Sequence, residues 1–344
     1  MNYPETTFAH LDRLTTEFGL HEHALYSDPR RDHGYCVDDV SRALVLLCRE
    51  PSLDARSTDM LELYLEFVIG AITINGRCHN RMNSDGEWID LPGRGDWWGR
   101  AVWCLGFAAV HAPLEAQRRR ALLGFRILAR STSPDIKAIC FSVLGAGELL
   151  LARPDEMCAR GILSHARSRL IAELTPRMMW PEPRFTYSNA SIPEASIVIG
   201  MALSDKTMLR LGISQLEFLL ESETRNGHLS VTPVGGRDFG KGQIGFDQQP
   251  IEVAAIADAS ARALVASCDN RWVEELNRAW SWFLGNNDVG TPMYNSNTGG
   301  GYDGLHARGP NQNQGAESTI SMLSTAQQAR LLHRVEAPSL VLTH

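Results

Sequence analysis

The stretch Asp96-Trp97-Trp98-Gly99-Arg100-Ala101 passes within a few residues from a polar cluster to an apolar helical run. Five other segments make the same transition, and they start at Asp38, Asp135, Asn189, Asp247 and Asn313. Successive starts lie 39 to 66 residues apart, which leaves room for two helices and their loops. The sequence therefore contains a degenerate internal repeat of a helix pair.

Apolar residues at three-to-four spacing predict the helices themselves. The predicted helices span 38–49, 57–73, 97–111, 114–130, 135–152, 155–174, 192–203, 205–222, 249–267, 270–285 and 315–332, with one more at 5–18. Helices that follow a junction carry Ala and Gly, which permit close packing, whereas those between junctions carry charged stripes. Six nearly apolar helices ringed by six amphipathic ones predict an all-α fold, the (α/α)6 toroid or six-hairpin barrel, with its polar helix starts at one mouth.

Length and composition set bounds on the domain organisation and the partner. The chain has 344 residues, of which 44% are hydrophobic, and a net charge of −7, so disorder is excluded. The core of a toroid is a ring, so we expect a single domain over 1–344, with 1–30 as N-terminal helix and lead-in and 333–344 as C-terminal tail. The mild acidity argues against nucleic acid as a partner.

Other sequence features bear on location and cofactors. The N-terminus has no basic segment followed by an apolar stretch, and no long apolar run occurs, so we expect a cytoplasmic protein without a membrane partner. The seven cysteines never form a CxxC pair, which is typical of reduced thiols. His21 and His23 have no third ligand at helical spacing, so we expect no metal ion and no cofactor. The sequence leaves the oligomeric state open.

The loops before the junction helices carry carboxyl groups suited to acid and base chemistry. Asp38 and Asp39 are neighbours with Arg42 one turn away, so like charge and the arginine act on their pKa values in opposite directions. Glu182, between two prolines, could be a desolvated general acid. We predict catalytic roles for Asp39, Asp96, Glu182 and Asp247. The alternative for each junction is simple helix capping, with a salt bridge to Arg42 at the first.

The same loops carry aromatic rings, amides and charged side chains. Indole rings can stack on a sugar face, and primary amides suit neutral hydroxyl groups better than phosphates. We predict substrate contacts by His33, Asp38, Arg42, Trp97, Trp98, Arg100, Trp180, Tyr187, Asn189, Gln248, Gln249, Tyr302, Asp303, Asn313, Gln314 and Glu317. Burial of the tryptophans in the core and a solvated helix face for the Gln248-Gln249 pair are the alternatives.

Taken in order, the motifs resemble those of a family of α/α six-barrel, glycosidase-like proteins, described as glycosyltransferase-associated proteins or hypothetical glycoside hydrolases. The resemblance rests on HGYCVDDVSRAL (33–44), DWWGRAVWCLG (96–106), WPEPRFTYSNASIPEA (180–195), FDQQPIEVAA (246–255), WFLGNND (282–288) and TGGGYDGL to NQNQGAEST (298–319). Two positions depart from the family pattern, because Val40-Ser41 replaces Asn-Ala and Gly301 replaces a common Cys. The resemblance implies the toroid fold and, less directly, an inverting glycoside hydrolase.

We therefore expect a carbohydrate-active protein, and foremost a glycoside hydrolase that acts on a neutral oligosaccharide or polysaccharide. Asp96 or Asp39 would act as the base, and Glu182 or Asp247 as the acid. One alternative is a sugar epimerase or isomerase, in which a mouth histidine (His33, His79 or His306) abstracts a proton. The other is a catalytically silent glycan-binding subunit of a polysaccharide-processing system.

Overall fold

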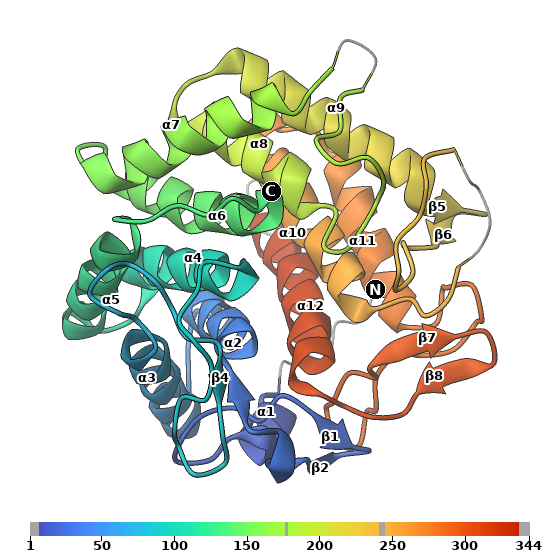
Figure 1. The fold of residues 1–344 in the computed structure, drawn as a ribbon. Helices are drawn as coiled ribbons and strands as arrows, with labels where there is room; N and C mark the ends of the chain where they lie inside the picture. Colours follow the sequence, from blue (N-terminus) through green and yellow to red (C-terminus); the bar gives the residue numbers. More distant parts are fainter. Residues whose placement is uncertain (1–6, 176–177, 241–244, 337–344) are drawn as a thin grey trace, which may run out of the picture.

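The computed structural model describes residues 7–175, 178–240 and 245–336, and in these residues it has twelve α-helices in two rings (Figure 1). Each helix of the inner ring contacts the next, and the last contacts the first, so that the ring closes. The inner helices are α2 (Val37–Arg49), α4 (Asp96–His111), α6 (Ile136–Ala152), α8 (Ser191–Ala202), α10 (Pro250–Ser267) and α12 (Ala316–Glu336). The predicted (α/α)6 toroid is confirmed.

Small residues set the spacing within the inner ring. Gly106 on α4 faces Gly145 on α6, and a Cβ atom built on Gly106 would lie 2.8 Å from the Gly145 Cα atom. A Cβ atom on Gly145 would lie 2.7 Å from the Trp103 Cα atom. Any larger residue would force the two backbones apart, which explains the Ala-rich and Gly-rich composition of these helices.

The outer helices pack against the inner ring with one face each. They are α3 (Ala55–Gly70), α5 (Glu115–Leu128), α7 (Met157–Ala172), α9 (Lys206–Glu223), α11 (Arg271–Phe283) and the short α1 (Ala9–Leu14), which contacts α12. On α11, Trp272, Leu276 and Trp280 are fully buried, whereas Glu274 is exposed. This amphipathic pattern is what the charged stripes of the sequence predict.

Both ends of the chain differ from the prediction. The first helix spans only Ala9–Leu14 rather than 5–18, because Thr15 is extended and the backbone turns back, with Thr16 N donating to Gly19 O at 2.9 Å. At the other end α12 continues to Glu336, so the predicted tail does not begin at residue 333. Residues 1–6 and 337–344, which belong to the predicted lead-in and tail, lie outside the described residues.

The loops at the two ends of the barrel differ in length. Links from an inner to an outer helix are short, such as 112–114 and 203–205, whereas the returns are long, such as 71–95 and 224–249. The long returns hold three antiparallel hairpins and the 3₁₀ turn η1 (Arg31–His33); the hairpins are β1–β2 (Ala24–Leu25 and Asp28–Pro29), β5–β6 (Thr224–Arg225 and His228–Leu229) and β7–β8 (Gly304–His306 and Gly309–Asn311). A fourth antiparallel pair, β3–β4 (Tyr35–Cys36 and Arg81–Met82), joins the loop before α2 to the loop before α4. These loops surround the mouth where the inner helices begin (Figure 1). In the described part of the chain, no helix is long and apolar enough to cross a membrane.

Candidate active site

A cavity of about 980 Å³ lies at the mouth of the barrel, where the inner helices begin. Five of the six junctions contribute to its lining, through Asp38, Asp96, Lys137, Gln249 and Glu317 in chain order. At the fourth junction, which starts at Asn189, the lining residues, such as Tyr187, lie in the loop just before it. The predicted convergence of the polar helix starts is therefore confirmed.

Most of the charged residues predicted for the site line this cavity, and so do one indole, one phenol and one amide. The predicted residues in the lining are Asp38, Asp39, Arg42, Asp96, Trp97, Glu182, Tyr187, Asp247, Gln249, Asp303 and Glu317. All four predicted catalytic carboxyl groups are among them.

Two of the predicted sugar-stacking rings are buried away from the cavity. Trp98 is the helical neighbour of Trp97 and therefore points about 100° away, and its indole N–H donates to Gly76 O at 3.0 Å. Trp180 is fully buried, with its ring centroid 5.1 Å from that of Phe185. Tyr302 packs against the core outside the cavity lining. Of the four rings predicted to stack on a sugar, Trp97 alone lines the cavity in the described part of the chain.

The predicted amide contacts other than Gln249 are used within the protein. Asn189 donates to Glu252 at 3.1 Å, and Gln248 donates to Asp288 at 2.7 Å. Asn313 accepts from the Tyr26 N–H at 2.9 Å, and Gln314 accepts from Thr298 at 2.5 Å. Asn189, Gln248 and Gln314 are buried amides, which need such partners, so they hold the mouth loops. Asn313 is only partly buried, and it lies outside the cavity lining.

Two further predicted contacts lie beside the cavity. Arg100 is buried, its Nε atom lies 2.7 Å from Asp38 Oδ1, and its guanidinium stacks on the Phe141 ring at 3.9 Å. His33 shares a hydrogen bond of 3.1 Å with His23 through their Nδ1 atoms. Since His23 lines the cavity, His33 lies behind that wall.

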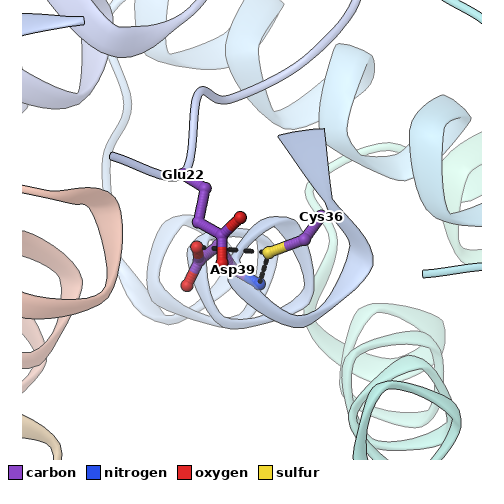
Figure 2. Close-up of side chains that lie close together, drawn as sticks. All are labelled: Glu22, Cys36 and Asp39. Carbon is purple, nitrogen blue, oxygen red and sulfur yellow. Dashed lines mark hydrogen bonds between the residues drawn. The ribbon is translucent and has the colours of Figure 1, made fainter. Parts of the chain in front are cut away.

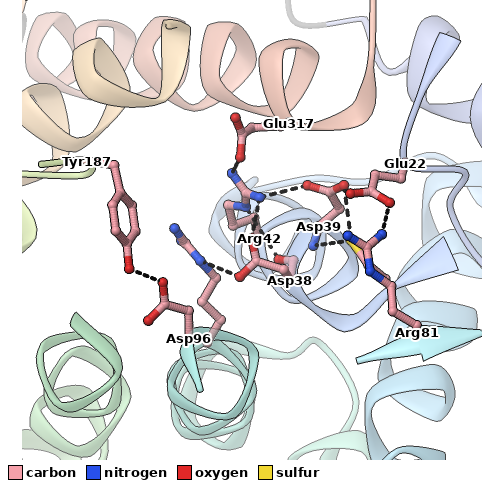
Figure 3. A network of polar contacts seen from close by, with 10 residues as sticks. Glu22, Asp38, Asp39, Arg42, Arg81, Asp96, Tyr187 and Glu317 are labelled. Atoms are coloured by element: carbon pink, nitrogen blue, oxygen red, sulfur yellow. Dashed lines mark hydrogen bonds and ion pairs between the residues drawn. The ribbon is translucent and has the colours of Figure 1, made fainter. Parts of the chain in front are cut away.

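Arg42 is the centre of a charge network that joins the first and last inner helices (Figure 3). Its guanidinium contacts Asp38 at 2.6 Å, Asp39 at 2.7 Å and Glu317 at 2.7 Å. Burial acts to raise the pKa of Asp38, but Arg100 and Arg42 outweigh it and lower that pKa below its usual value. For Asp39 burial dominates and raises the pKa to about 7. The pKa values of these neighbouring carboxyl groups are thus shifted in opposite directions.

Asp96 and Tyr187, which both line the cavity, point toward each other and are in direct contact (Figure 3). The Tyr187 hydroxyl donates a hydrogen bond to Asp96 Oδ2. Burial raises the pKa of Asp96, although this hydrogen bond and the nearby Arg100 oppose the shift. The pKa of Tyr187 is raised in turn by burial and by the Asp96 charge, so the phenol stays a donor.

Asp247 is a cavity carboxyl group with few partners. Its Oδ1 atom is buried against Gly304 and has no hydrogen-bond partner in the described residues, and its Oδ2 atom lies 3.8 Å from His306 Nε2. Burial raises the pKa of Asp247, and the charge of His306 opposes that shift. Such a carboxyl group is suited to carry a proton.

Lys137 is a cavity residue that we did not select from the sequence. Its side chain is only 3% exposed, and Nζ lies 3.2 Å from Glu182 Oε2 and 5.6 Å from the Tyr187 ring. The third junction, Ser133-Pro134-Asp135-Ile136-Lys137, contained the signal, because five of the six junctions place a side chain in the cavity lining. Glu22 and Arg81, which also line the cavity and pair with each other, come from loops without such a signal.

Two trios of side chains could in principle hold a metal ion, because their ligand atoms lie within 4.8 Å of one another. Figure 2 shows the first, Glu22, Cys36 and Asp39, in which the Cys36 thiol donates to Asp39 at 3.2 Å. Burial and then the Asp39 charge raise the pKa of Cys36, and Arg81 already pairs with Glu22. The second trio, Asp38, Asp39 and Glu317, surrounds the guanidinium of Arg42. Because arginines already balance both trios, we propose no metal ion.

Neither a protein-family model nor a curated protein matches the sequence. Solved structures do match the fold. A cellobiose 2-epimerase from Bacillus thermoamylovorans B4167 superposes with a TM-score of 0.70 at 11% identity, over 94% of this chain and 95% of that one. A sugar epimerase from a ruminal bacterium has a TM-score of 0.69 at 14% identity, over 93% of this chain and 95% of that one. A GH76 α-mannanase from Bacteroides thetaiotaomicron has a TM-score of 0.69 at 11% identity, over 96% of this chain and 95% of that one.

These similarities extend over nearly the whole chain, and the identities are low, so they concern the fold. The chain has the (α/α)6, six-hairpin fold that these solved structures share.

Proposed function

We propose that the protein is a glycoside hydrolase that acts on a neutral oligosaccharide or polysaccharide with inversion at the anomeric carbon. The supporting observation is the presence of two carboxyl groups with different surroundings in one cavity. Burial raises the pKa of Asp247 with only the charge of His306 opposing it, whereas the Tyr187 hydrogen bond and two cations, Arg100 and Lys137, oppose the effect of burial on the pKa of Asp96. Glycoside hydrolysis needs both a protonated acid and an ionised carboxylate.

We assign the acid to Asp247 and the base to Asp96. Asp247 gives its proton to the glycosidic oxygen as the bond between that oxygen and the anomeric carbon breaks. Asp96 takes a proton from the water molecule that attacks the anomeric carbon from the opposite face. The Tyr187 hydroxyl, which donates to Asp96, stabilises its carboxylate form and fixes its orientation.

The other two predicted catalytic residues fit supporting roles better. Asp39 is almost fully buried and is held by Arg42 and Cys36, so it keeps the network around Asp38 in place. Glu182 is paired with Lys137 and accepts from the Thr186 hydroxyl at 3.1 Å. We propose that it balances the buried ammonium group.

The test is a screen of the purified protein against β-mannosides, β-glucosides and microbial exopolysaccharide fragments, with NMR detection of the first-formed anomer. Asp96→Asn and Asp247→Asn should each lower kcat by roughly 10²–10⁴-fold. Asp85→Asn, at an exposed turn, is the matched control and should match the wild type. Hydrolysis that survives both site substitutions would contradict the assignment, and binding without any product would favour a silent glycan-binding subunit.

A sugar epimerase is the second candidate, and one observation favours it. His306 is half-exposed, and its Nε2 atom lies 3.8 Å from Asp247, so an imidazole and a carboxyl group face the same space. Two of the similar structures are epimerases by description. Incubation with reducing sugars in D₂O distinguishes this candidate, because proton abstraction beside a carbonyl introduces deuterium. Deuterium uptake that His306→Ala abolishes would support the epimerase over the hydrolase.

A further inference from the structure

A second cavity, of about 320 Å³, lies beside the first. Thr186, Tyr187 and Gln249 line both cavities, so the two spaces meet at these side chains. The outer wall of the second cavity includes Pro233, Val234 and Arg184. Its volume is near the lower end of the range of small-molecule sites, roughly 300–1,000 Å³.

The lining of the second cavity combines apolar surface with hydrogen-bonding groups. Val234 is 59% exposed and lies in the wall with Pro233, and the Tyr187 ring is 42% exposed at the boundary. The Gln249 side chain precedes α10 without a capping hydrogen bond to it, so among the described residues it can bind a ligand in the second cavity. A pyranose has an apolar C–H face and a rim of hydroxyls, and it needs both kinds of surface.

The charges of this cavity are already balanced, in contrast to the acidic first cavity. The Arg184 Nε atom lies 3.3 Å from Asp238. Glu252, the carboxyl group in the lining, accepts hydrogen bonds from the Ser188 and Asn189 backbone N–H groups and from the Asn189 side chain. A neutral sugar residue therefore fits better than a uronic acid or a sulfated sugar.

We propose that the second cavity binds a further neutral sugar residue of the substrate, so that the enzyme acts on oligosaccharide chains rather than on single glycosides. This proposal rests on the proposed hydrolase function. Tyr187 connects the two sites, because it lines both cavities and its hydroxyl donates to Asp96 (Figure 3). A chain that passes Tyr187 would place one linkage beside the proposed base and a third sugar, beyond the two that flank this linkage, in the second cavity.

The experiment compares Val234→Trp, which fills the second cavity, with Val265→Trp as the matched control. Val234 is exposed and lines only the second cavity, and Val265 is 67% exposed on α10 and lines neither, so both variants should fold. The probes are cello-oligosaccharides and β-1,4-manno-oligosaccharides from dimer to hexamer. Val234→Trp should lower kcat/KM about tenfold for the longer substrates and leave the dimer unchanged, and Val265→Trp should match the wild type.

Other outcomes separate the failure of this proposal from the failure of the hydrolase function. An equal effect of Val234→Trp on all chain lengths, or no effect on any, would overturn the subsite. If the wild type cleaves none of the probes, the hydrolase function fails. The subsite is then measured by NMR titration with the hexamers, in which Val234→Trp must weaken binding about tenfold and Val265→Trp must not. Unchanged hexamer binding by Val234→Trp, or no binding by the wild type, would refute it.

Discussion

Replacement of Gly304 by alanine perturbs the proposed acid without touching the substrate. A Cβ atom built on Gly304 would lie 2.8 Å from Asp247 Cγ and closer still to Oδ1. Carbon atoms in comfortable contact are about 3.5–4.0 Å apart, so the carboxyl group must move by roughly half an ångström or more. The Asp247 carboxyl is the end of a flexible side chain, and Gly304 has no positive φ, so the chain should still fold.

The expected result is a large loss of activity with a small loss of stability. A displacement of about 1 Å at a catalytic group can cost about 10²-fold in rate, whereas overpacking of this kind costs about 1–3 kcal/mol at most. We therefore expect kcat of Gly304→Ala to fall by about 30- to 100-fold, with KM changed much less. The assays are steady-state kinetics on the best substrate of the screen and thermal unfolding followed by circular dichroism.

Gly161→Ala is the matched control, because a Cβ atom at that position on α7 meets nothing within 4 Å. It should keep full activity and gain about 0.5–1 kcal/mol from the better helix propensity of alanine. If Gly304→Ala is as active as the wild type, then the position of the Asp247 carboxyl does not limit the reaction, and its assignment as the acid is wrong.

Three further predictions test the site and the core. Tyr187→Phe removes a donor from Asp96, so the pKa of Asp96 should rise and the acidic limb of the kcat/KM profile should move to higher pH; an unmoved limb would argue against Asp96 as the base. Burial raises the pKa values of Glu194 and Glu252 to about 8, so the folded state binds more protons than the unfolded state above pH 4.5, and stability is lost as pH rises through 8. The unfolding temperature should therefore fall from pH 7 to pH 9, and a rise would refute this account. Trp180→Ala should lower the free energy of unfolding in urea by about 3–5 kcal/mol, because Trp180 is buried in the core. Unchanged stability with a raised KM would show instead that Trp180 contacts the sugar.

The fold could be predicted because every junction carries its signal locally. A polar cluster followed by an Ala-rich or Gly-rich run marks an inner helix, and the close approach of Gly106 and Gly145 is the physical reason for that composition. The first helix was predicted too long, because its end depends on a turn at Gly19. That turn packs against Phe67, a residue distant in sequence.

The site could be predicted only in part. A cluster of polar residues in the sequence does not show whether their side chains face a cavity or are hydrogen-bonded to one another inside the protein. Asp96 and Asp247 were found because a helix start fixes their place at the mouth. Asn189 looked equally polar, but its partner is Glu252, 63 residues further along the chain. Lys137 was missed because a lysine before an apolar run usually lies at the surface, and only the ring geometry buries it beside Glu182.

The ion pair between Arg42 and Glu317 makes completion of the cavity depend on the order in which the chain is synthesised. Residues 316–336, which form α12, are synthesised after the other eleven helices described, and until they dock, α2 and α10 have no neighbour on that side of the ring. During that interval the mouth lacks one wall, and Arg42 lacks one of its three carboxylates. A chain without docked α12 therefore has no complete cavity at the mouth, and the proposed activity should arise only when the ring closes.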